Sequence, residues 1–234
     1  MSITALIATL RRRAHLIKAR RFGVPLPLIP VLRNGHSLSI VDVGAHIGSF
    51  TKSISASYSI NVAILVEAQK ALVDRLSRDF TGPNFRVIHA AVTDKSGTTI
   101  LHRTKFEPAA SVLMPIVTSE HMSLIELHHE DEICPAGSLD ELLAPLALEI
   151  VDLVKIDVQG AEHLVLAGGR ETLARTRVLW VEVSFERLYE GACLFHEVYG
   201  TLSSMNFGLR DLAPVFRGPS GDLVQADALF VARK

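Results

Sequence analysis

The segment from Ser39 to Thr51 constrains the fold of this chain more than any other stretch. It reads SIVDVGAHIGSFT: an apolar run, then a turn with Gly44 and Gly48, then residues that favour a helix. An apolar strand that leads through a Gly-rich turn into a helix is typical of an open α/β sheet that binds a nucleotide-like ligand. The segment therefore predicts a doubly wound α/β fold with a ligand site at this turn.

Apolar runs and helical patterns alternate along the rest of the chain, as expected for a mostly parallel, twisted sheet with helices on both faces. We expect strands at 38–43, 61–66, 85–89, 98–103, 150–158 and 178–183, and helices at 47–56, 70–80, 139–143, 161–166 and 196–204. Residues 207–211 and 228–231 are expected to form an antiparallel C-terminal hairpin. Residues 104–137 break the alternation and are expected to form an irregular insertion that serves as a lid or binding loop.

The first 35 residues differ in charge from residues 36–234, which we expect to form one domain. The chain has a net charge of −1, yet before Asp42 it carries seven basic and no acidic residues, so the remainder carries −8. This arm can be an amphipathic helix that packs Ile7, Leu10, Ala14 and Ile17 on the body, or a surface for anionic lipid or a phosphate-bearing substrate. Nucleic acid is not an expected partner, because no recognition motif accompanies the arginines. The Pro-rich stretch 24–32 is expected to be a linker.

Cysteine content and hydropathy bear on location. The two cysteines, Cys134 and Cys193, lack a partner motif, which fits a reducing compartment. No signal peptide or membrane span is recognised in the sequence. We expect a cytoplasmic protein, with peripheral membrane contact as an alternative if the basic arm binds lipid.

The glycine spacing distinguishes between nucleotide cofactors. A dinucleotide fingerprint needs a middle glycine where this chain has His46, and that side chain would crowd a pyrophosphate. S-adenosylmethionine has no pyrophosphate. Asp42 can accept from its ammonium group, backbone N–H groups after Gly44 can hold its carboxylate, and Glu67 can bind both ribose hydroxyls.

At this point the chain resembles the FkbM-type S-adenosylmethionine-dependent methyltransferases over residues 38–211. The resemblance is carried by VDVGAHIGSF (41–50), VEA (66–68), AAVTDKSG (90–97), SLDEL (138–142), LVKIDVQGAE (153–162) and LWVEV (179–183). Two residues depart from the family pattern, His46 in place of Asn and Gln159 in place of Glu. The resemblance implies a Rossmann-like class I methyltransferase fold in residues 36–234. It also implies a hydroxyl acceptor on a sugar, a lipid or a polyketide-type product.

The expected cofactor-binding residues are Asp42, Gly44, Ala45, His46, Gly48, Phe50, Thr51, Glu67, Ala68, Ala91, Val92 and Asp157. The acceptor is expected to be a small molecule or a glycan or lipid, bound near residues 104–137 and 185–195. Arg187 and Tyr189 in the second of these segments suit a sugar or a phosphate-bearing molecule.

The favoured candidates for the base that removes the hydroxyl proton are three carboxylates, Asp157, Glu162 and Glu182. His163 is a further candidate, although it is expected to be a surface residue of a helix. Asp157 follows a mostly apolar run and is expected to be partly desolvated, although it can also cap the next helix. Glu162 lies in the first turn of that helix, where the helix dipole alone can account for it. Glu182 lies within a buried strand, where a carboxylate is costly unless it is paired, for example with Lys155, or functional.

Other interpretations stay open. His121, His128 and His129 with Glu130 or Asp131 can be read as metal ligands, and Asp157 as a magnesium ligand, but no metal site is favoured. The chain can also be a non-catalytic module that binds the cofactor. An NAD(P)-dependent oxidoreductase is the third interpretation, against which the missing glycine speaks.

Overall fold

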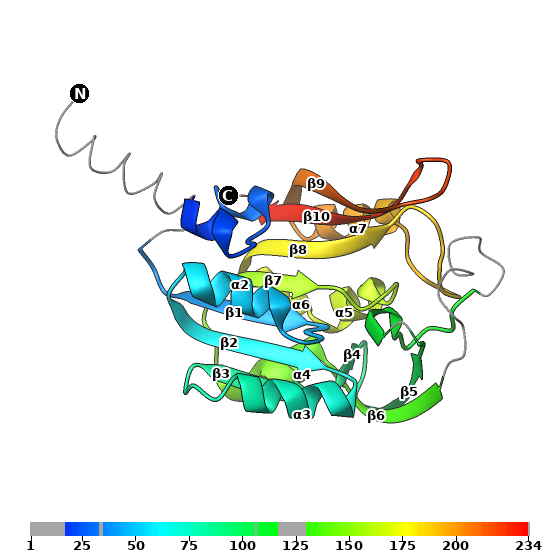
Figure 1. Ribbon diagram of the computed structural model, residues 1–234, viewed down its shortest axis with the longest axis horizontal. Helices are drawn as coiled ribbons and strands as arrows, with labels where there is room; N and C mark the ends of the chain where they lie inside the picture. The colour runs from blue at the N-terminus through cyan, green and yellow to red at the C-terminus, as the bar shows by residue number, and fades with distance from the viewer. Residues whose placement is uncertain (1–16, 33–34, 106, 117–129, 234) are drawn as a thin grey trace.

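The computed structural model describes residues 17–32, 35–105, 107–116 and 130–233. Within these residues, seven strands form one twisted sheet in the order β3-β2-β1-β7-β8-β10-β9 (Figure 1). The first five strands of that order are parallel, and β10 runs antiparallel to both β8 and β9. The strands are β1 (Leu38–Val43), β2 (Ile60–Glu67), β3 (Phe85–His89), β7 (Val151–Ile156), β8 (Thr176–Ser184), β9 (Phe207–Arg217) and β10 (Leu223–Ala232). The predicted α/β fold is confirmed.

The C-terminal hairpin is larger than expected. Its two strands are β9 and β10, and β10 pairs with β8 from Gln225 to Val231, so the hairpin extends the main sheet. The strand predicted at 150–158 is shorter, because β7 ends at Ile156. Asp157 and Val158 therefore lie in the turn that follows β7.

The insertion expected at 104–137 is only partly irregular. A second, three-stranded sheet in the order β4-β6-β5 consists of β4 (Ala91–Thr93), β5 (Gly97–Arg103) and β6 (Glu130–Ser138). The expectation was wrong for residues 130–137, which pair with both neighbouring strands although the segment begins with three acidic residues and contains Pro135. A short helix, η2 (Glu107–Ala109), lies in the insertion, and residues 117–129, with the three histidines, lie outside the described residues.

Helices cover both faces of the main sheet (Figure 1). One face packs against α2 (Ser49–Ser57) and α3 (Lys70–Asp79). The other packs against α4 (Leu139–Leu143), α5 (Glu162–Gly168), α6 (Arg170–Ala174) and α7 (Phe195–Ser204). A short helix η4 (Ala144–Leu146) extends α4. Ser138 caps α4, because its hydroxyl accepts from the Glu141 N–H and the Glu141 carboxylate accepts from the Ser138 N–H in return.

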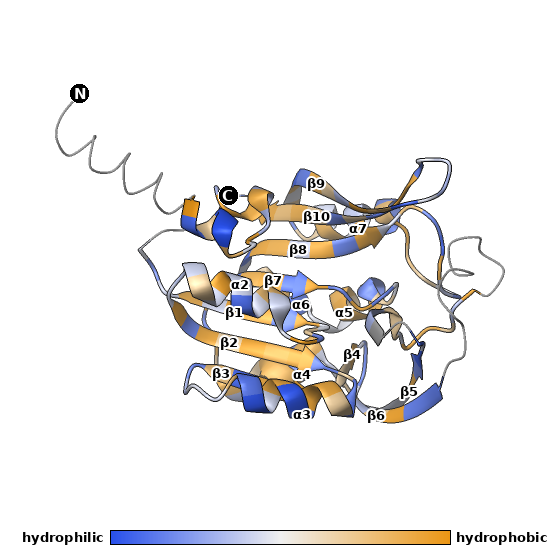
Figure 2. Cartoon of the chain, viewed as in Figure 1, coloured by the Kyte–Doolittle hydropathy of each residue, from blue (hydrophilic) through white to orange (hydrophobic). Residues whose placement is uncertain are grey.

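Side chains alternate along the central strands, as the two-residue period of a strand requires. In β1, Leu38 and Ile40 belong to the core on the α2 face, and Val41 and Val43 belong to the core on the α5 face. Figure 2 shows that the central strands are mostly apolar and that helix surfaces carry most of the hydrophilic colour. Asp42 follows Leu38 and Ile40 on the α2 face, so the first polar side chain that β1 places on this face comes at its carboxyl end.

The segment predicted as a Pro-rich linker is instead packed on the body. Val24, Leu28 and Leu32, together with Ala19, are buried in the core on the α2 face, and η1 (Leu26–Leu28) forms a turn between them. Ile17 is 67% exposed, so it does not pack on the body as one interpretation of the arm required. Ile7, Leu10 and Ala14 lie outside the described residues. Contact of the arm with a membrane stays a prediction. None of the helices in the described residues is long and apolar enough to cross a membrane.

Gly44 offers a test of how closely the loop after β1 approaches the loop after β7. Gly44 has φ 72°, and a Cβ there would overlap the carbonyl oxygen of Asp157, whereas Gly191 has φ 74° and open space around it. Gly191→Ala is expected to lose about 1 kcal/mol of unfolding free energy from left-handed strain alone. Gly44→Ala is expected to lose at least twice as much in urea unfolding. Equal losses would contradict the close approach of the two loops.

Candidate functional site

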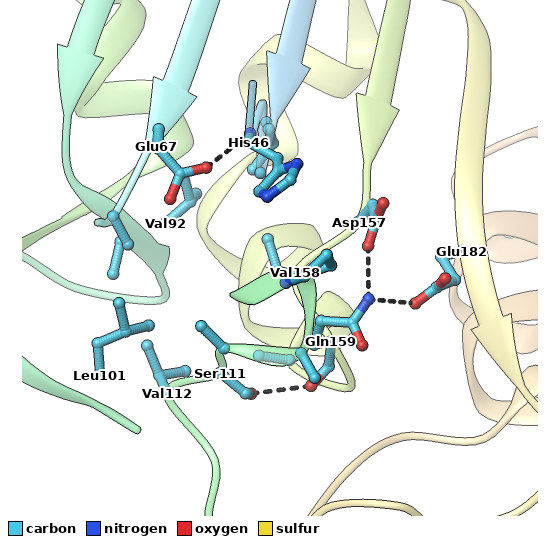
Figure 3. A pocket seen from close by; sticks show the side chains of 18 of the residues that line it. His46, Glu67, Val92, Leu101, Ser111, Val112, Asp157, Val158, Gln159 and Glu182 are labelled. Carbon is cyan, nitrogen blue, oxygen red and sulfur yellow. Dashed lines mark hydrogen bonds between the residues drawn. The ribbon is translucent and has the colours of Figure 1, made fainter. Parts of the chain in front are cut away.

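A cavity of about 520 Å³ lies at the carboxyl ends of β1, β2, β7 and β8 (Figure 3). The chain leaves β1 toward β2 on one side and later returns to β7 on the other side, so the strand order reverses between β1 and β7. Such a switch point is where open α/β sheets bind ligands. The volume lies within the range of small-molecule sites. The remaining walls come from β4, β5, β9, β10 and residues 108–112.

Glu67 lies at one end of the cavity, at the end of β2. Glu67 is 6% exposed, and one of its carboxylate oxygens accepts from the backbone N–H of His46 at 2.7 Å (Figure 3). The other accepts from the backbone N–H of Gln69 at 2.9 Å. Burial raises the pKa of Glu67, and these hydrogen bonds counteract part of the effect. Each carboxylate oxygen can accept a second hydrogen bond, so the group is suited to hold a pair of hydroxyls.

His46 adopts a left-handed backbone, with φ 50°. Histidine is one of the residues that tolerate this region better than most. The conformation turns the His46 N–H toward Glu67, so the residue that departs from the family pattern still fixes the Glu67 side chain.

Small and apolar side chains line the cavity next to Glu67. Ala68 and Ala91 contribute little volume, and Val92, Leu101 and Val112 extend the wall (Figure 3). A slot of this kind suits the flat, largely apolar faces of a heterocycle. It lies beside the group that is suited to bind ribose hydroxyls.

Lys155 lies behind the cavity wall and is nearly buried. Its Nζ donates to the Gly44 carbonyl at 2.7 Å and lies 3.2 Å from Asp157 Oδ2 and 3.6 Å from Asp42 Oδ1. Burial alone would lower the pKa of Lys155, but the charges of Asp157 and Asp42 outweigh it, so the pKa is raised. Lys155 therefore stays charged and links the loop after β1 to the loop after β7. The ion pair of Lys155 with Glu182, one of the two alternatives for that carboxylate, is not formed; Lys155 lies against Asp42 and Asp157 instead.

Asp42 is 1% exposed and accepts from the Thr51 hydroxyl at 2.6 Å. Burial raises its pKa, and Lys155 and Thr51 oppose that shift. Neither Asp42 nor Thr51 lines the cavity. The structure thus places Asp42 beneath the Gly-rich turn, where it supports Lys155 and the start of α2.

The expected site residues divide into two groups. Gly44, His46, Glu67, Ala68, Ala91, Val92, Asp157 and Glu182 line the cavity, whereas Asp42, Ala45, Gly48, Phe50, Thr51 and Glu162 do not. Gly48 is needed for packing, because a Cβ there would overlap the ring of Phe80. That residues of the second group contact a ligand stays a prediction. Their positions are consistent with a supporting role for the loops after β1 and β7.

Asp157 and Glu182 lie at the other end of the cavity. Asp157 is bound by Lys155, and its side chain is 32% exposed, so it is partly desolvated, as expected. Glu182 is buried, and its Oε2 accepts from Gln159 Nε2 at 2.9 Å and from Gln225 Nε2 at 3.0 Å. Burial raises the pKa of Glu182 well above its ordinary value, and the charges of Asp157, Glu162 and Asp227 add to the effect.

Sequence reasoning missed three polar residues that line this end: Gln159, Gln225 and Ser111. Tyr189, named as an acceptor-site residue, does line the cavity. Arg187 does not, because it donates to the Ala192 carbonyl and pairs with Glu197 at 3.2 Å. Among the described residues that line the cavity there is no lysine or arginine. The described residues at this end therefore present carboxylates, amides and hydroxyls but no cationic side chain to pair with a phosphate.

Glu162 shapes the turn after β7. It is buried, and its Oε1 accepts from the Val158 N–H at 3.2 Å and the Gly160 N–H at 3.1 Å. Burial raises the pKa of Glu162 to about 7, although the backbone hydrogen bonds oppose this and Asp157 adds to it. In this arrangement Glu162 holds the turn through these two backbone hydrogen bonds, and its role as a base stays a prediction.

The described residues hold no group of three or more metal-ligating side chains. His121, His128 and His129 lie outside them.

Comparison with known proteins identifies relatives of this chain. A family model described as "Methyltransferase FkbM domain" matches residues 42–209. The 2-O-methyltransferase NoeI of Sinorhizobium fredii (strain NBRC 101917 / NGR234) is 30% identical over 158 residues, which are 63% of this chain and 62% of that protein. The match thus spans less than two thirds of that relative.

Two solved structures share the fold. Methyltransferase FkbM from Methylobacillus flagellatus KT has a TM-score of 0.54 and 15% identity, over 86% of this chain and 45% of that one. Magnesium protoporphyrin IX methyltransferase (ChlM) from Synechocystis PCC 6803, solved with bound SAM, has a TM-score of 0.51 and 10% identity, over 97% of this chain and 82% of that one.

Glu162→Gln tests the cost of the buried carboxylate. Gln keeps the Oε1 acceptor, and it removes a group whose pKa is about 7 in the folded state against an ordinary 4.5. The folded wild type binds more protons than the unfolded chain between these values, so its stability falls as pH rises through them. The free energy of unfolding of the variant, relative to that of the wild type, is expected to rise by about 3 kcal/mol between pH 4.5 and about pH 8.

The measurement for this variant is urea unfolding across that pH range. Glu171→Gln, at an exposed residue in the first turn of α6, is the control and is expected to show no such gain. A constant difference between Glu162→Gln and the wild type at all pH values would contradict the assignment.

Proposed function

The chain belongs to the FkbM methyltransferase family, and on this premise we propose that it transfers a methyl group from S-adenosylmethionine to a hydroxyl oxygen of a neutral, sugar-like acceptor. One observation carries the proposal: a single cavity has Glu67 and an apolar slot at one end and the carboxylates of Asp157 and Glu182 at the other. The first end suits an adenosine and the second suits proton transfer. Family membership and the NoeI relative support the type of reaction.

The chain's residues fit the cofactor by the chemistry of the groups they offer. Glu67 would bind the two ribose hydroxyls, and Ala68, Ala91 and Val92 would flank the adenine. The Asp157 carboxylate would lie near the positive charges of the amino acid end and the sulfonium, and Gly44 lets the backbone approach closely. The bound cofactor supplies an electrophilic methyl carbon: its bond to the acceptor oxygen forms as its bond to sulfur breaks, and the sulfur keeps that electron pair.

Glu182 is the base that this proposal favours. A hydroxyl bound at this end of the cavity loses its proton to the Glu182 carboxylate as the oxygen becomes bonded to carbon. A raised pKa makes the ionised carboxylate a stronger base than an ordinary glutamate. It also means that the group is ionised only above that pKa, so the rate is expected to rise with pH through it.

The acceptor is proposed to be uncharged. No lysine or arginine is among the described lining residues, and Asp157 and Glu182 would repel a phosphate. Leu188, Val215 and Phe216 line the same end and add apolar surface. A hydroxyl on a sugar, a glycolipid or a similar natural product fits these walls, and the name of the 2-O-methyltransferase relative supports oxygen as the atom that is methylated.

Cofactor binding is the first test. Titration calorimetry with S-adenosylhomocysteine is expected to give micromolar affinity, and NAD(H) is expected not to bind. Glu67→Gln is expected to weaken S-adenosylhomocysteine binding about tenfold or more, because one ribose hydroxyl loses a charged acceptor. Glu149→Gln, an exposed residue just before β7, is the matched control. Equal affinity of Glu67→Gln and the control would contradict the assigned role of Glu67.

Turnover tests the other end of the cavity. Glu182→Gln is expected to bind S-adenosylhomocysteine within about twofold of the wild type, and to lower kcat about 100-fold or more. Transfer of a labelled methyl group to a panel of neutral glycosides measures kcat. Wild-type activity is expected to fall as pH drops through the raised pKa of Glu182. A variant that retains full turnover would show that another group takes the proton.

A further inference from the structure

A single side-chain amide touches both carboxylates at the acceptor end of the cavity. Gln159 Nε2 donates to Asp157 Oδ1 and to Glu182 Oε2, each at 2.9 Å (Figure 3). An amide nitrogen carries two hydrogens, so the two bonds use its full donor capacity. The two carboxylate oxygens are therefore held less than twice that distance apart, around one N–H₂ group.

The carboxylates also fix which way the amide points. If the amide were turned over, Gln159 Oε1 would face two acceptor oxygens, and both favourable bonds would be replaced by repulsion. On the opposite side of the amide, Oε1 lies 3.2 Å from the Tyr189 hydroxyl oxygen. That hydroxyl has one hydrogen to donate, either to Oε1 or to the Ala109 carbonyl oxygen at 3.0 Å. Burial raises the pKa of Tyr189, so this hydroxyl stays protonated and remains a donor.

The backbone of Gln159 is held as firmly as its side chain. It lies in the left-handed region, with φ 56°, and its carbonyl accepts from the Ser111 hydroxyl at 2.8 Å. A residue with a long side chain adopts this conformation at a cost, so the surrounding contacts must favour it. Ser111 and Ala109 belong to the segment that lines the cavity opposite the strands, and Gln159 thus connects that segment to the carboxylates.

We propose that Gln159 is a positioning residue: its amide holds the Asp157 and Glu182 carboxylates side by side at the cavity. Two neighbouring carboxylates need a shared proton, a cation or a hydrogen-bond donor between them, and here the amide nitrogen is that donor. The role in methyl transfer rests on the proposed function, whereas the effect on the two carboxylates does not. Asp157 stays bound to Lys155, and Glu182 keeps the orientation in which it can receive a proton from the acceptor.

The amide can be replaced by a group of the same shape. Gln159→Glu puts a third carboxylate where the donor was, and Gln159→Met removes the donor without adding charge. Gln225→Glu is the matched control, because Gln225 Nε2 donates to Glu182 Oε2 at 3.0 Å but makes no hydrogen bond to Asp157. Carbon-13 NMR of labelled Asp and Glu carboxyl groups follows their titration in the ligand-free protein.

Gln159→Glu is expected to move the titrations of both Asp157 and Glu182 to higher pH, by about one unit or more for Glu182. Gln159→Met is expected to move both in the same direction by less. Gln225→Glu is expected to move the Glu182 titration, but to displace the Asp157 titration less than half as far as Gln159→Glu does. If neither Gln159 variant displaces the Asp157 titration further than Gln225→Glu does, the bridging role of Gln159 is overturned.

Activity gives an independent readout. In Gln159→Glu the acidic limb of the rate profile is expected to move to higher pH together with the Glu182 titration. Failure of the proposed function would appear as absent binding of S-adenosylhomocysteine to the wild type, and it would leave the NMR result standing. An unchanged rate profile together with a displaced Glu182 titration would remove Gln159 from the transfer step.

Discussion

The site depends on one buried ammonium group, that of Lys155. It bonds the Gly44 carbonyl and lies close to the carboxylates of Asp42 and Asp157, and so joins the ends of two neighbouring strands. A buried charge is tolerated only where opposite charges and hydrogen bonds replace water. The loops after β1 and β7 must therefore stay together. Their fixed positions define the part of the cavity wall that lies between β1 and β7.

The polar groups of the site are confined by strand periodicity to one face of the sheet. Asp42 pairs in register with Lys155, and Glu182 pairs with Asp227. Asp42, Lys155 and Glu182 lie near the carboxyl ends of their strands, and the register places Asp227 beside Glu182 at the same level of the sheet. Burial raises the pKa of Asp227 to about 6, with a further contribution from Asp157. Several carboxylates thus share a small volume with one cation, an arrangement that favours function over stability.

The sequence predicts this site where local pattern is sufficient. Glu67 and Asp157 each follow an apolar run, and parallel strands bring their carboxyl ends to one edge, so their convergence on a cavity follows from the pattern. The strand β6 was missed because its acidic start and Pro135 resemble a loop, and its pairing with β4 and β5 is non-local. Gln225 was missed for a related reason: it reaches Glu182 from a strand 43 residues further along the chain. Only the packed sheet brings the two together.

The two ends of the cavity are formed largely by different elements. The end with Glu67 is formed by the loop after β1 and by β2, β4 and β5, whereas the end with Glu182 is formed by β8, β9, β10 and the segment after β8. Substitutions in the second set change the walls around an acceptor and leave the walls around Glu67 intact. The walls around an acceptor can therefore be reshaped through a long hairpin and its neighbouring loop, while the groups that surround Glu67 keep their positions.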